Sequence, residues 1–526
     1  MGATPLAELV RSSAVERHRD LPALASAVPV VSAYVSRSEI EDRYPYQRFM
    51  RERKKFVDMI NATPTLAIQI DKQLEDAREK GLPGRTVYER FAYTYAQQSG
   101  VASDPETIRL FAVSVGDELV GLAGLEDLIR DLSVMNITIV WRQGSPCRVR
   151  VHHVGNQHED LKIQVAPSWS AYKDTIIGRA ISMSHKQTNL SMNTPYVEMV
   201  IKDYEARFVA SLSADGSQIF SSMRLNRVGD PDLDDLLKLG VIPTSDVRNF
   251  LKIAMAARCN ILFAGPQQSG KTTILRGYIN SVPRDEEIMI VEDIPELGIE
   301  DSARHDVVLN FEASPQAPMR VTISRAMRYV VRRIFVGEAL DSAVLNWLFA
   351  SVRLRGSACT LHAESMGKVF EAIVGLSTIN TDGFAPVPRD VVLRNVADAV
   401  DFIVFMEPEE SPDDPQKSFP TVKGILAIDD QVSSSGLPKS SVLWEWDPKA
   451  KALIWGQSGL PDHIARRWSS IGLSLNPVGD RPQIVVNNPS KVPSSLIDIV
   501  DETYEAKRGL HADPSSAFFI SDEGPK

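Results

Sequence analysis

The segment "ILFAGPQQSGKTTIL", residues Ile261 to Leu275, joins an apolar run to a loop that carries two glycines, a lysine and two threonines. It satisfies the spacing G-x-x-x-x-G-K-[ST] of a P-loop, in which backbone amides surround phosphate oxygens. The motif positions are Gly265, Gly270, Lys271 and Thr272, and Ser269 and Thr273 lie beside them. In such loops the lysine contacts the terminal phosphate oxygens and the threonine hydroxyl binds Mg²⁺. These six residues are therefore the predicted nucleotide site.

Strand-like and helix-like segments alternate after this motif. The strand-like segments are "NILFAG", "EIMIVED" (Glu287 to Asp293), "RRIFVGE" (Arg332 to Glu338) and "GSACTLHA" (Gly356 to Ala363). Continuous apolar strands separated by helices are typical of a parallel sheet that is buried on both faces. The sequence therefore predicts an α/β domain with a parallel-rich sheet.

Acidic residues end two of these strands. Hydrolysis of a bound nucleotide needs a carboxylate near the metal, a carboxylate for the attacking water, and positive charge. Glu338 ends one strand where a Walker B acid belongs, and Glu292 and Asp293 end another, with Glu296 one turn further on. His362 closes a third strand. Ligands bind beyond the carboxyl ends of parallel strands, so these groups are expected in one crevice. The alternatives are a helix N-cap for each acid and a structural role for the histidine.

The rest of the chain predicts further domains. Residues 1–83 combine charge runs with helical patterning and are expected to be helical or partly disordered. Residues 84–228 mix helical and alternating segments, which is typical of an α+β domain. An acidic linker, 229–243, precedes the nucleotide-binding domain at 244–475, which includes a C-terminal subdomain. Residues 476–526 are rich in Pro, Ser and Asp and are expected to be mostly disordered.

Composition excludes several classes of function. A formal net charge of -10 argues against a surface built to neutralise phosphates, so direct nucleic-acid binding is not supported. The apolar runs are too short to cross a bilayer, and we expect a cytoplasmic protein, free or attached to the membrane surface. The three cysteines form no C-x-x-C pair, and the adjacent His152 and His153 would point to opposite faces of a strand. No zinc site is expected.

The order of four motifs resembles the type II/type IV secretion ATPase superfamily. The motifs are the Walker A loop, an "ED..EL" box at Glu292, an "R-I-h-h-G-E" Walker B ending at Glu338, and "T-h-H-A" at His362. The similarity runs from about Gly121 to Glu407. It implies an α+β N-terminal domain joined to a RecA-like ATPase domain, with ATP and Mg²⁺ as cofactors. It also implies a homo-oligomeric ring, expected to be a hexamer, at the inner face of the cell membrane. The partners would be inner-membrane components of a secretion, conjugation or pilus-assembly machine.

The resemblance also implies roles for single residues. Glu292 would activate the attacking water, and Glu338 would be the Walker B acid that binds Mg²⁺ together with Thr272. His362 would sense the phosphate or relay its state. Arg328 matches an arginine that precedes Walker B and is included among the catalytic residues.

Two arginines of the N-terminal domain and two departures complete the prediction. Arg207 and Arg224 fall where arginines of that domain reach the nucleotide, although a surface or salt-bridge role is equally open. Leu340 and Glu364 replace an arginine and an asparagine of the family pattern. These departures suit a slow or partner-dependent ATPase. The rival readings are a nucleotide-gated scaffold with little or no turnover and a nucleic-acid motor with the same core.

Overall fold

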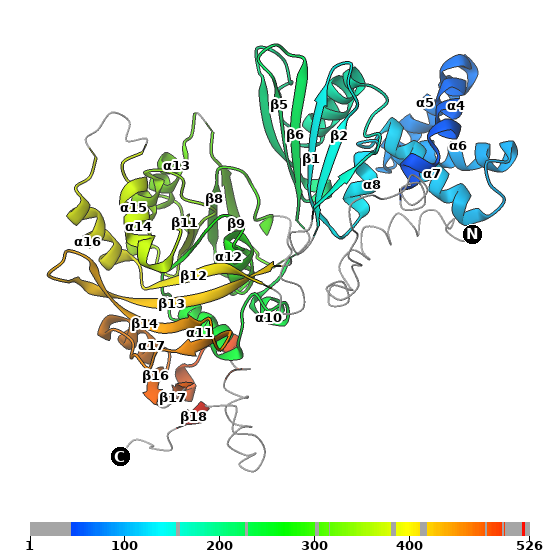
Figure 1. The fold of residues 1–526 in the computed structure, drawn as a ribbon. Coiled ribbons are helices and arrows are strands. Elements are labelled where there is room, and N and C mark those ends of the chain that lie inside the picture. The colour runs from blue at the N-terminus through cyan, green and yellow to red at the C-terminus, as the bar shows by residue number, and fades with distance from the viewer. Residues whose placement is uncertain are drawn as a thin grey trace. The chain divides into compact units, whose positions relative to one another are not determined.

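The computed structural model divides the chain into two compact units, Met1–Arg227 and Val228–Lys526 (Figure 1). It describes residues 44–153, 158–226, 230–299, 304–314, 316–379, 386–410, 418–478, 481–496, 499 and 518–520. Each unit has its own apolar core, so each is described by itself. Among the described residues no helix is both long enough and apolar enough to span a bilayer.

The first unit begins with a helical bundle. Its helices are α3 (Pro45–Arg48), α4 (Met50–Ala62), α5 (Pro64–Glu79), α6 (Gly84–Ser99), α7 (Pro105–Leu119) and α8 (Leu125–Arg130). Val87 of α6 packs against Ile70 and Ala77 of α5, and the apolar face of α6 also joins Phe56 and Phe111 in one cluster. The predicted boundary between residues 83 and 84 is therefore wrong, because it cuts through this bundle.

A six-stranded antiparallel sheet follows in the same unit. Its order is β3-β2-β1-β6-β5-β4, with β1 (Val134–Arg142), β2 (Arg148–His153), β3 (His158–Leu161), β4 (Tyr196–Ile201), β5 (Ala206–Leu212) and β6 (Gln218–Leu225). Strict alternation of buried and half-buried residues along β5 leaves one face for the core. Helix α9 (Ile177–Met183), which directly follows a π-helical stretch, Ala171–Ile176, adds to that core. The α+β character predicted here is confirmed.

The second unit is built on a nine-stranded sheet of order β15-β14-β13-β12-β7-β11-β10-β8-β9. The strands are β7 (Ile261–Gly265), β8 (Ile288–Glu292), β9 (Val308–Glu312), β10 (Arg333–Val336), β11 (Ala358–His362), β12 (Phe402–Glu410), β13 (Ser418–Val432), β14 (Pro438–Asp447) and β15 (Ala452–Trp455). Strands β12, β7, β11, β10, β8 and β9 are parallel to one another, and β13 to β15 extend the sheet in antiparallel fashion.

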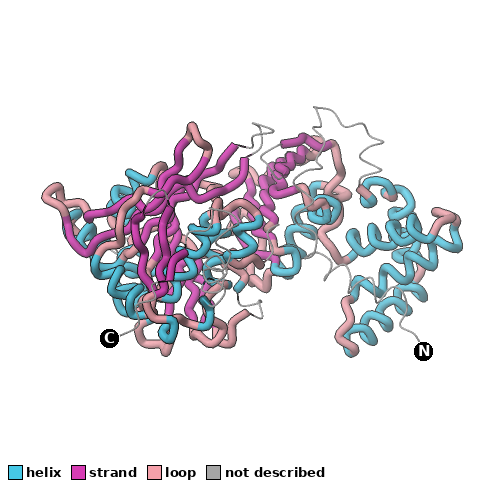
Figure 2. Tube along the Cα trace, turned by 90° about the horizontal axis from the view of Figure 1, so that it is seen from below, coloured by secondary structure: helices cyan, strands magenta, loops and turns pink. Residues whose placement is uncertain are grey.

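Helices cover both faces of this sheet (Figure 2). They are α10 (Leu233–Lys238), α11 (Ser245–Ala256), α12 (Lys271–Asn280), α13 (Met319–Ala326), α14 (Ala343–Arg353), α15 (Val369–Leu376), α16 (Arg389–Ala399) and α17 (Asp462–Ser470). Ile261 and Phe263 face one core, and Leu262 and Ala264 face the other. Burial on both faces explains the continuous apolar strands in the sequence. The predicted RecA-like α/β class with a parallel-rich sheet is confirmed.

The C-terminal region differs from the prediction. Strands β16 (Leu473–Val478) and β17 (Arg481–Val486) form a hairpin, and β18 (Phe518–Ile520) pairs with β17. Alternate apolar residues of the hairpin, such as Leu475 and Ile484, are buried in the same apolar core as residues of α11 and α17. The prediction of disorder from residue 476 onward is therefore wrong for this segment. A few buried apolar side chains outweigh its proline-rich composition. Residues 501–517 and 521–526 lie outside the described part of the chain.

Candidate functional site

The P-loop connects β7 to α12 through backbone that only glycine fits. Gly270 caps α12 with φ of 86°, in the left-handed region. A Cβ at Gly270 would lie 2.5 Å from Cβ of Pro420, and one at Gly265 would lie 2.2 Å from the carbonyl oxygen of Met406. Both neighbours belong to the β12–β13 pair, which borders the loop. The glycines therefore let the loop pass close to these strands, while the first amides of α12 have no partner within the helix and are available to an anion.

Lys271 lies beneath this loop. Its side chain is buried, and its Nζ donates a hydrogen bond to the carbonyl oxygen of Pro266 at 2.7 Å. Ser269 is also buried, while Thr272 and Thr273 are half-buried in the first turn of α12. The positive end of the helix dipole and the lysine charge therefore act at the same place.

The predicted acids and histidine end neighbouring strands at one edge of the sheet. The parallel register pairs His362 with Gly265, and Val336 with both Val291 and Cys359. Glu292 directly follows Val291, and Glu338 follows Val336 after one intervening glycine. The structure therefore brings both acids to the end of the sheet where the P-loop begins. The convergence expected from the strand order is present.

Glu338, His362 and Lys271 form one chain of contacts. Nε2 of His362 lies 2.7 Å from Oε1 of Glu338, and its Nδ1 lies 3.2 Å from Nζ of Lys271. An ammonium group only donates, so Nδ1 is assigned as the acceptor and Nε2 as the protonated nitrogen. A neutral His362 in this tautomer satisfies both contacts. The Walker B acid and the P-loop lysine are thereby coupled through one imidazole.

Glu292 is held more rigidly than Glu338 and His362. Its side chain is buried, and Oε1 accepts hydrogen bonds from the backbone N–H groups of Glu296 at 2.9 Å and Leu297 at 3.0 Å. A Cβ at Gly337 would lie 2.9 Å from Cγ of Glu292. The glycine before Glu338 is therefore needed for Glu292 to approach the end of β10. These hydrogen bonds order the turn after β8, and no α-helix begins in residues 293–299, so the helix-cap alternative is not supported for Glu292.

The site includes residues that the sequence did not indicate. Thr360 on β11 is buried and donates from Oγ1 to the carbonyl oxygen of Gly337 at 2.5 Å, which fixes the turn before Glu338. Met406 and Pro420 border the P-loop from strands far along the chain. Only the pairing of β12 with β7 brings them there, so no local pattern could have marked them. Burial raises the pKa of the neighbouring Cys359 thiol, which excludes it as a nucleophile at neutral pH.

Three predicted arginines are carried by other elements than those that form the P-loop end of the sheet. Arg328 is exposed in the segment between α13 and the first residue of β10, so it lies toward the amino ends of the strands, away from the P-loop edge of its own chain. Arg207 and Arg224 are paired across β5 and β6 in the first unit, and Arg207 forms an ion pair with Glu198. Their roles at a nucleotide stay predictions.

The two departures from the family pattern point to solvent. The side chain of Glu364 is 80 % exposed and pairs with Lys368, whose hydrogen bond lowers the pKa of that carboxyl group. Leu340 is also exposed. Neither residue contributes to the contacts around Lys271.

Residues 202–404 match the family model described as Type II/IV secretion system protein, and this range contains all four motifs. Over these residues the chain is similar to the type II/IV secretion system protein family. The protein is similar to "Type IV secretion system protein VirB11" of Brucella suis, with 26% identity over 174 residues, 32% of this chain and 48% of that protein. It is similar to "Protein VirB11" of Agrobacterium fabrum, with 29% identity over 164 residues, 30% of this chain and 47% of that protein. The chain thus spans about half the length of the curated relatives it matches.

Among solved structures, the Legionella pneumophila ATPase DotB is 17% identical at a TM-score of 0.42, covering 58% of this chain and 81% of that one. The pilus retraction motor PilT with bound ADP is 18% identical at a TM-score of 0.38, covering 54% of this chain and 77% of that one.

Proposed function

We propose that this secretion-family chain binds and hydrolyses Mg-ATP and thereby drives a secretion, conjugation or pilus-assembly machine. The observation that carries the proposal is the contact chain from Lys271 through His362 to Glu338, at the mouth of a P-loop. A lysine and a carboxylate at the carboxyl ends of parallel strands are groups that phosphoryl transfer uses, and here His362 connects them.

The residues of the loop fit a nucleotide and its metal. Glycine at positions 265 and 270 lets the loop pass close to Met406 and Pro420, and the backbone amides of this loop would contact the phosphate oxygens. Lys271 would donate to the terminal phosphate in place of its bond to Pro266, and Thr272 and Glu338 would hold Mg²⁺. The metal, when bound, offsets the negative charge that develops on the phosphate oxygens.

Glu292 and His362 have different tasks in this scheme. Glu292 is held at the edge by two backbone N–H groups, and it would orient the attacking water and accept its proton. His362 would lose its contact with Lys271 when the lysine moves to a phosphate. Its bond to Glu338 then transmits that change to the end of β10, which gives a route from the phosphate state to the sheet.

At the level of the assembly, we propose a homo-oligomeric ring, expected to be a hexamer, at the cytoplasmic face of the membrane with inner-membrane partners. The names of the VirB11 relatives support a secretion role, and the exposed position of Arg328 suits action on a neighbouring subunit. Arg207 and Arg224 would report nucleotide state to the first unit. The specific rival is a nucleotide-gated scaffold, which the departures at Leu340 and Glu364 favour. The other rival function is that of a nucleic-acid motor.

Steady-state phosphate release by the purified full chain separates these functions. Lys271→Ala should abolish ATP binding, and Glu338→Gln should retain binding while turnover falls by on the order of 100-fold or more. Glu371→Gln, an exposed acid on α15, is the matched control and should leave both unchanged. Release that is at background in the unaltered chain and insensitive to Glu338→Gln would favour the scaffold. Stimulation by DNA that weakens with salt would favour the motor.

A further inference from the structure

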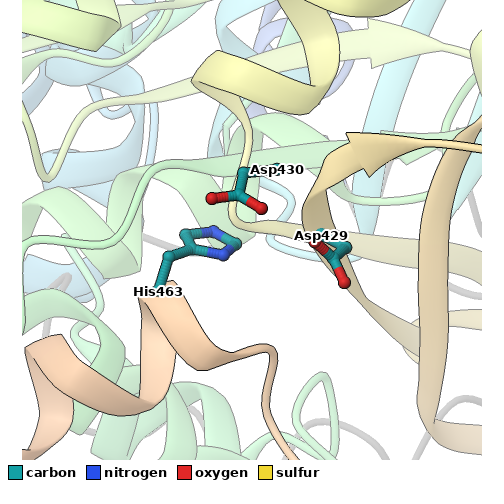
Figure 3. Close-up of side chains that lie close together, drawn as sticks. All are labelled: Asp429, Asp430 and His463. Atoms are coloured by element: carbon teal, nitrogen blue, oxygen red, sulfur yellow. The ribbon is translucent and has the colours of Figure 1, made fainter.

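Two aspartates and a histidine lie close together at the end of the same sheet that is opposite the P-loop. Asp429 and Asp430 lie near the end of β13, and His463 lies in the first turn of α17. One possible ligand atom from each lies within 4.8 Å of the others. Figure 3 shows the imidazole of His463 facing the two carboxylates. Asn260 and Asp401, which hold this region, directly precede β7 and β12, so the cluster is at the amino ends of the strands, away from the P-loop.

An irregularity in β13 explains how two consecutive aspartates share a side. Consecutive residues on a regular strand point to opposite faces. The pairing of β13 with β14 shifts register between Ile428 and Val432, which brackets both aspartates. Such irregularities re-aim side chains and are frequent beside functional sites. Oδ1 of Asp429 also accepts the backbone N–H of Gln431 at 3.2 Å, which orients one carboxylate.

A buried carboxylate orients the histidine. Oδ1 of Asp401 lies 3.4 Å from Nε2 of His463, and its Oδ2 accepts from Arg467 at 2.5 Å and from the backbone N–H of Asn260 at 2.7 Å. With Oδ2 engaged by these two donors, Oδ1 of Asp401 is placed to accept the Nε2 proton.

The other nitrogen of this ring is left as an acceptor. Nδ1 of His463 has almost no accessible surface and no hydrogen-bond partner in the described part of the chain. An imidazole whose one N–H is held by a carboxylate, with its second nitrogen unprotonated, is the arrangement found at metal-binding histidines. The guanidinium groups of Arg467 and Arg355 offset the charge of Asp401, so Asp429 and Asp430 supply the negative charge for a cation.

We propose that His463, Asp429 and Asp430 bind one divalent first-row transition-metal cation, zinc or manganese, which ties α17 to the end of β13. An imidazole with two carboxylates suits these ions, whereas Mg²⁺ and Ca²⁺ prefer oxygen alone. Ligand atoms on one such ion are at most about 4.2 Å apart, so a small adjustment of the side chains would bring the three groups onto one ion. The expectation of no zinc site rested on cysteine spacing and on adjacent histidines, and neither concerns these distant residues.

Titration calorimetry on the full chain, stripped of metal by a chelator, tests this site. Zn²⁺ or Mn²⁺ should bind once per chain, and Mg²⁺ at the same concentrations should not compete. The double variant Asp429→Asn with Asp430→Asn changes exposed or half-exposed groups with little change of shape, so it should fold and bind at least tenfold more weakly. His463→Ala should also lose binding.

The control is His158→Ala, which removes one ring of the His152–His158 pair, where the rings lie 6.1 Å apart. It should leave the affinity unchanged. The proposal is overturned if no ion binds, if the double aspartate variant binds as tightly as the unaltered chain, or if the loss occurs in His158→Ala instead. The melting temperature gives a second readout, because a bound ion should raise it in the unaltered chain but not in the double variant.

Discussion

Replacing Arg333 by alanine should destabilise the second unit far more than replacing its neighbour Arg332. Arg333 is 1 % exposed and donates to both carboxylate oxygens of Glu286, at 2.7 and 2.8 Å. It also donates to the carbonyl oxygens of Met255 at 3.0 Å and Gly356 at 3.2 Å. Breaking a buried ion pair by removing one partner costs about 3–5 kcal/mol. Because other contacts to Glu286 survive, we expect the lower end, about 3 kcal/mol.

Arg332 provides the matched comparison. It forms the same type of pair, with Glu287 at 2.9 Å, but its side chain is 60% exposed. Exposed pairs contribute about 0.2–1 kcal/mol. Urea unfolding of both variants, followed by the fluorescence of the buried Trp347 and Trp468 in the same unit, measures the difference. A difference between the variants below about 1 kcal/mol would refute the argument that burial decides the strength of these pairs.

The stability that the chain loses in Arg333→Ala should depend on pH in a definite direction. Burial raises the pKa of Glu286, but hydrogen bonding and charge from Arg333 outweigh it and lower the pKa overall. A lowered pKa in the folded state means stabilisation that is complete above the unfolded value of about 4.3 and is lost as pH falls through the folded value. The gap between unaltered chain and Arg333→Ala should therefore narrow below about pH 4. A gap that widens in acid would contradict the assignment.

Three further substitutions test other parts of the molecule. Gly337→Ala should displace Glu292 and lower turnover by on the order of 100-fold with ATP affinity retained, and normal phosphate release would contradict this. His362→Ala removes the 3.2 Å contact to Lys271 and the 2.7 Å contact to Glu338, so turnover should fall at least about tenfold, as single-turnover assays would show. Burial, followed by repulsion from Asp117, raises the pKa of Asp127 to about 7. The first unit should therefore lose stability as pH rises from about 4 to about 7, and Asp127→Asn should flatten that slope in melting curves; an unchanged slope would exclude the assignment.

The parts of the fold that local sequence determines were predictable. The P-loop motif, the continuous apolar strands and the acids at their ends carry their own signals, and β7, β8, β10 and β11 form as expected. Trp444 and Trp455 are paired across the short β14–β15 hairpin, and their rings lie 4.8 Å apart. In each case the pattern and the structure concern residues that are close in sequence.

Contacts between distant segments were not predictable in this way. The border that Met406 and Pro420 form around the P-loop depends on β12 pairing with β7, and nothing near either residue encodes that partner. The helical bundle was divided wrongly because each helix has only a modest apolar stripe, and the joint burial of Ile70 and Val87 is visible only in three dimensions.

The carboxyl and amino ends of the strands in the large sheet carry different chemistry. Substitutions at the two ends should therefore have different effects. At the carboxyl edge, Lys271 and Glu338 are linked through a half-exposed His362, so charge can be exchanged with a ligand. At the amino edge, Arg333 and Asp401 are almost wholly buried and fully engaged, which favours fixed geometry over exchange. Loss of Arg333 or of the aspartate pair at β13 should therefore lower stability or metal affinity while ATP affinity of the folded protein stays unchanged. A parallel loss of ATP affinity would show that the two edges are coupled through the strands.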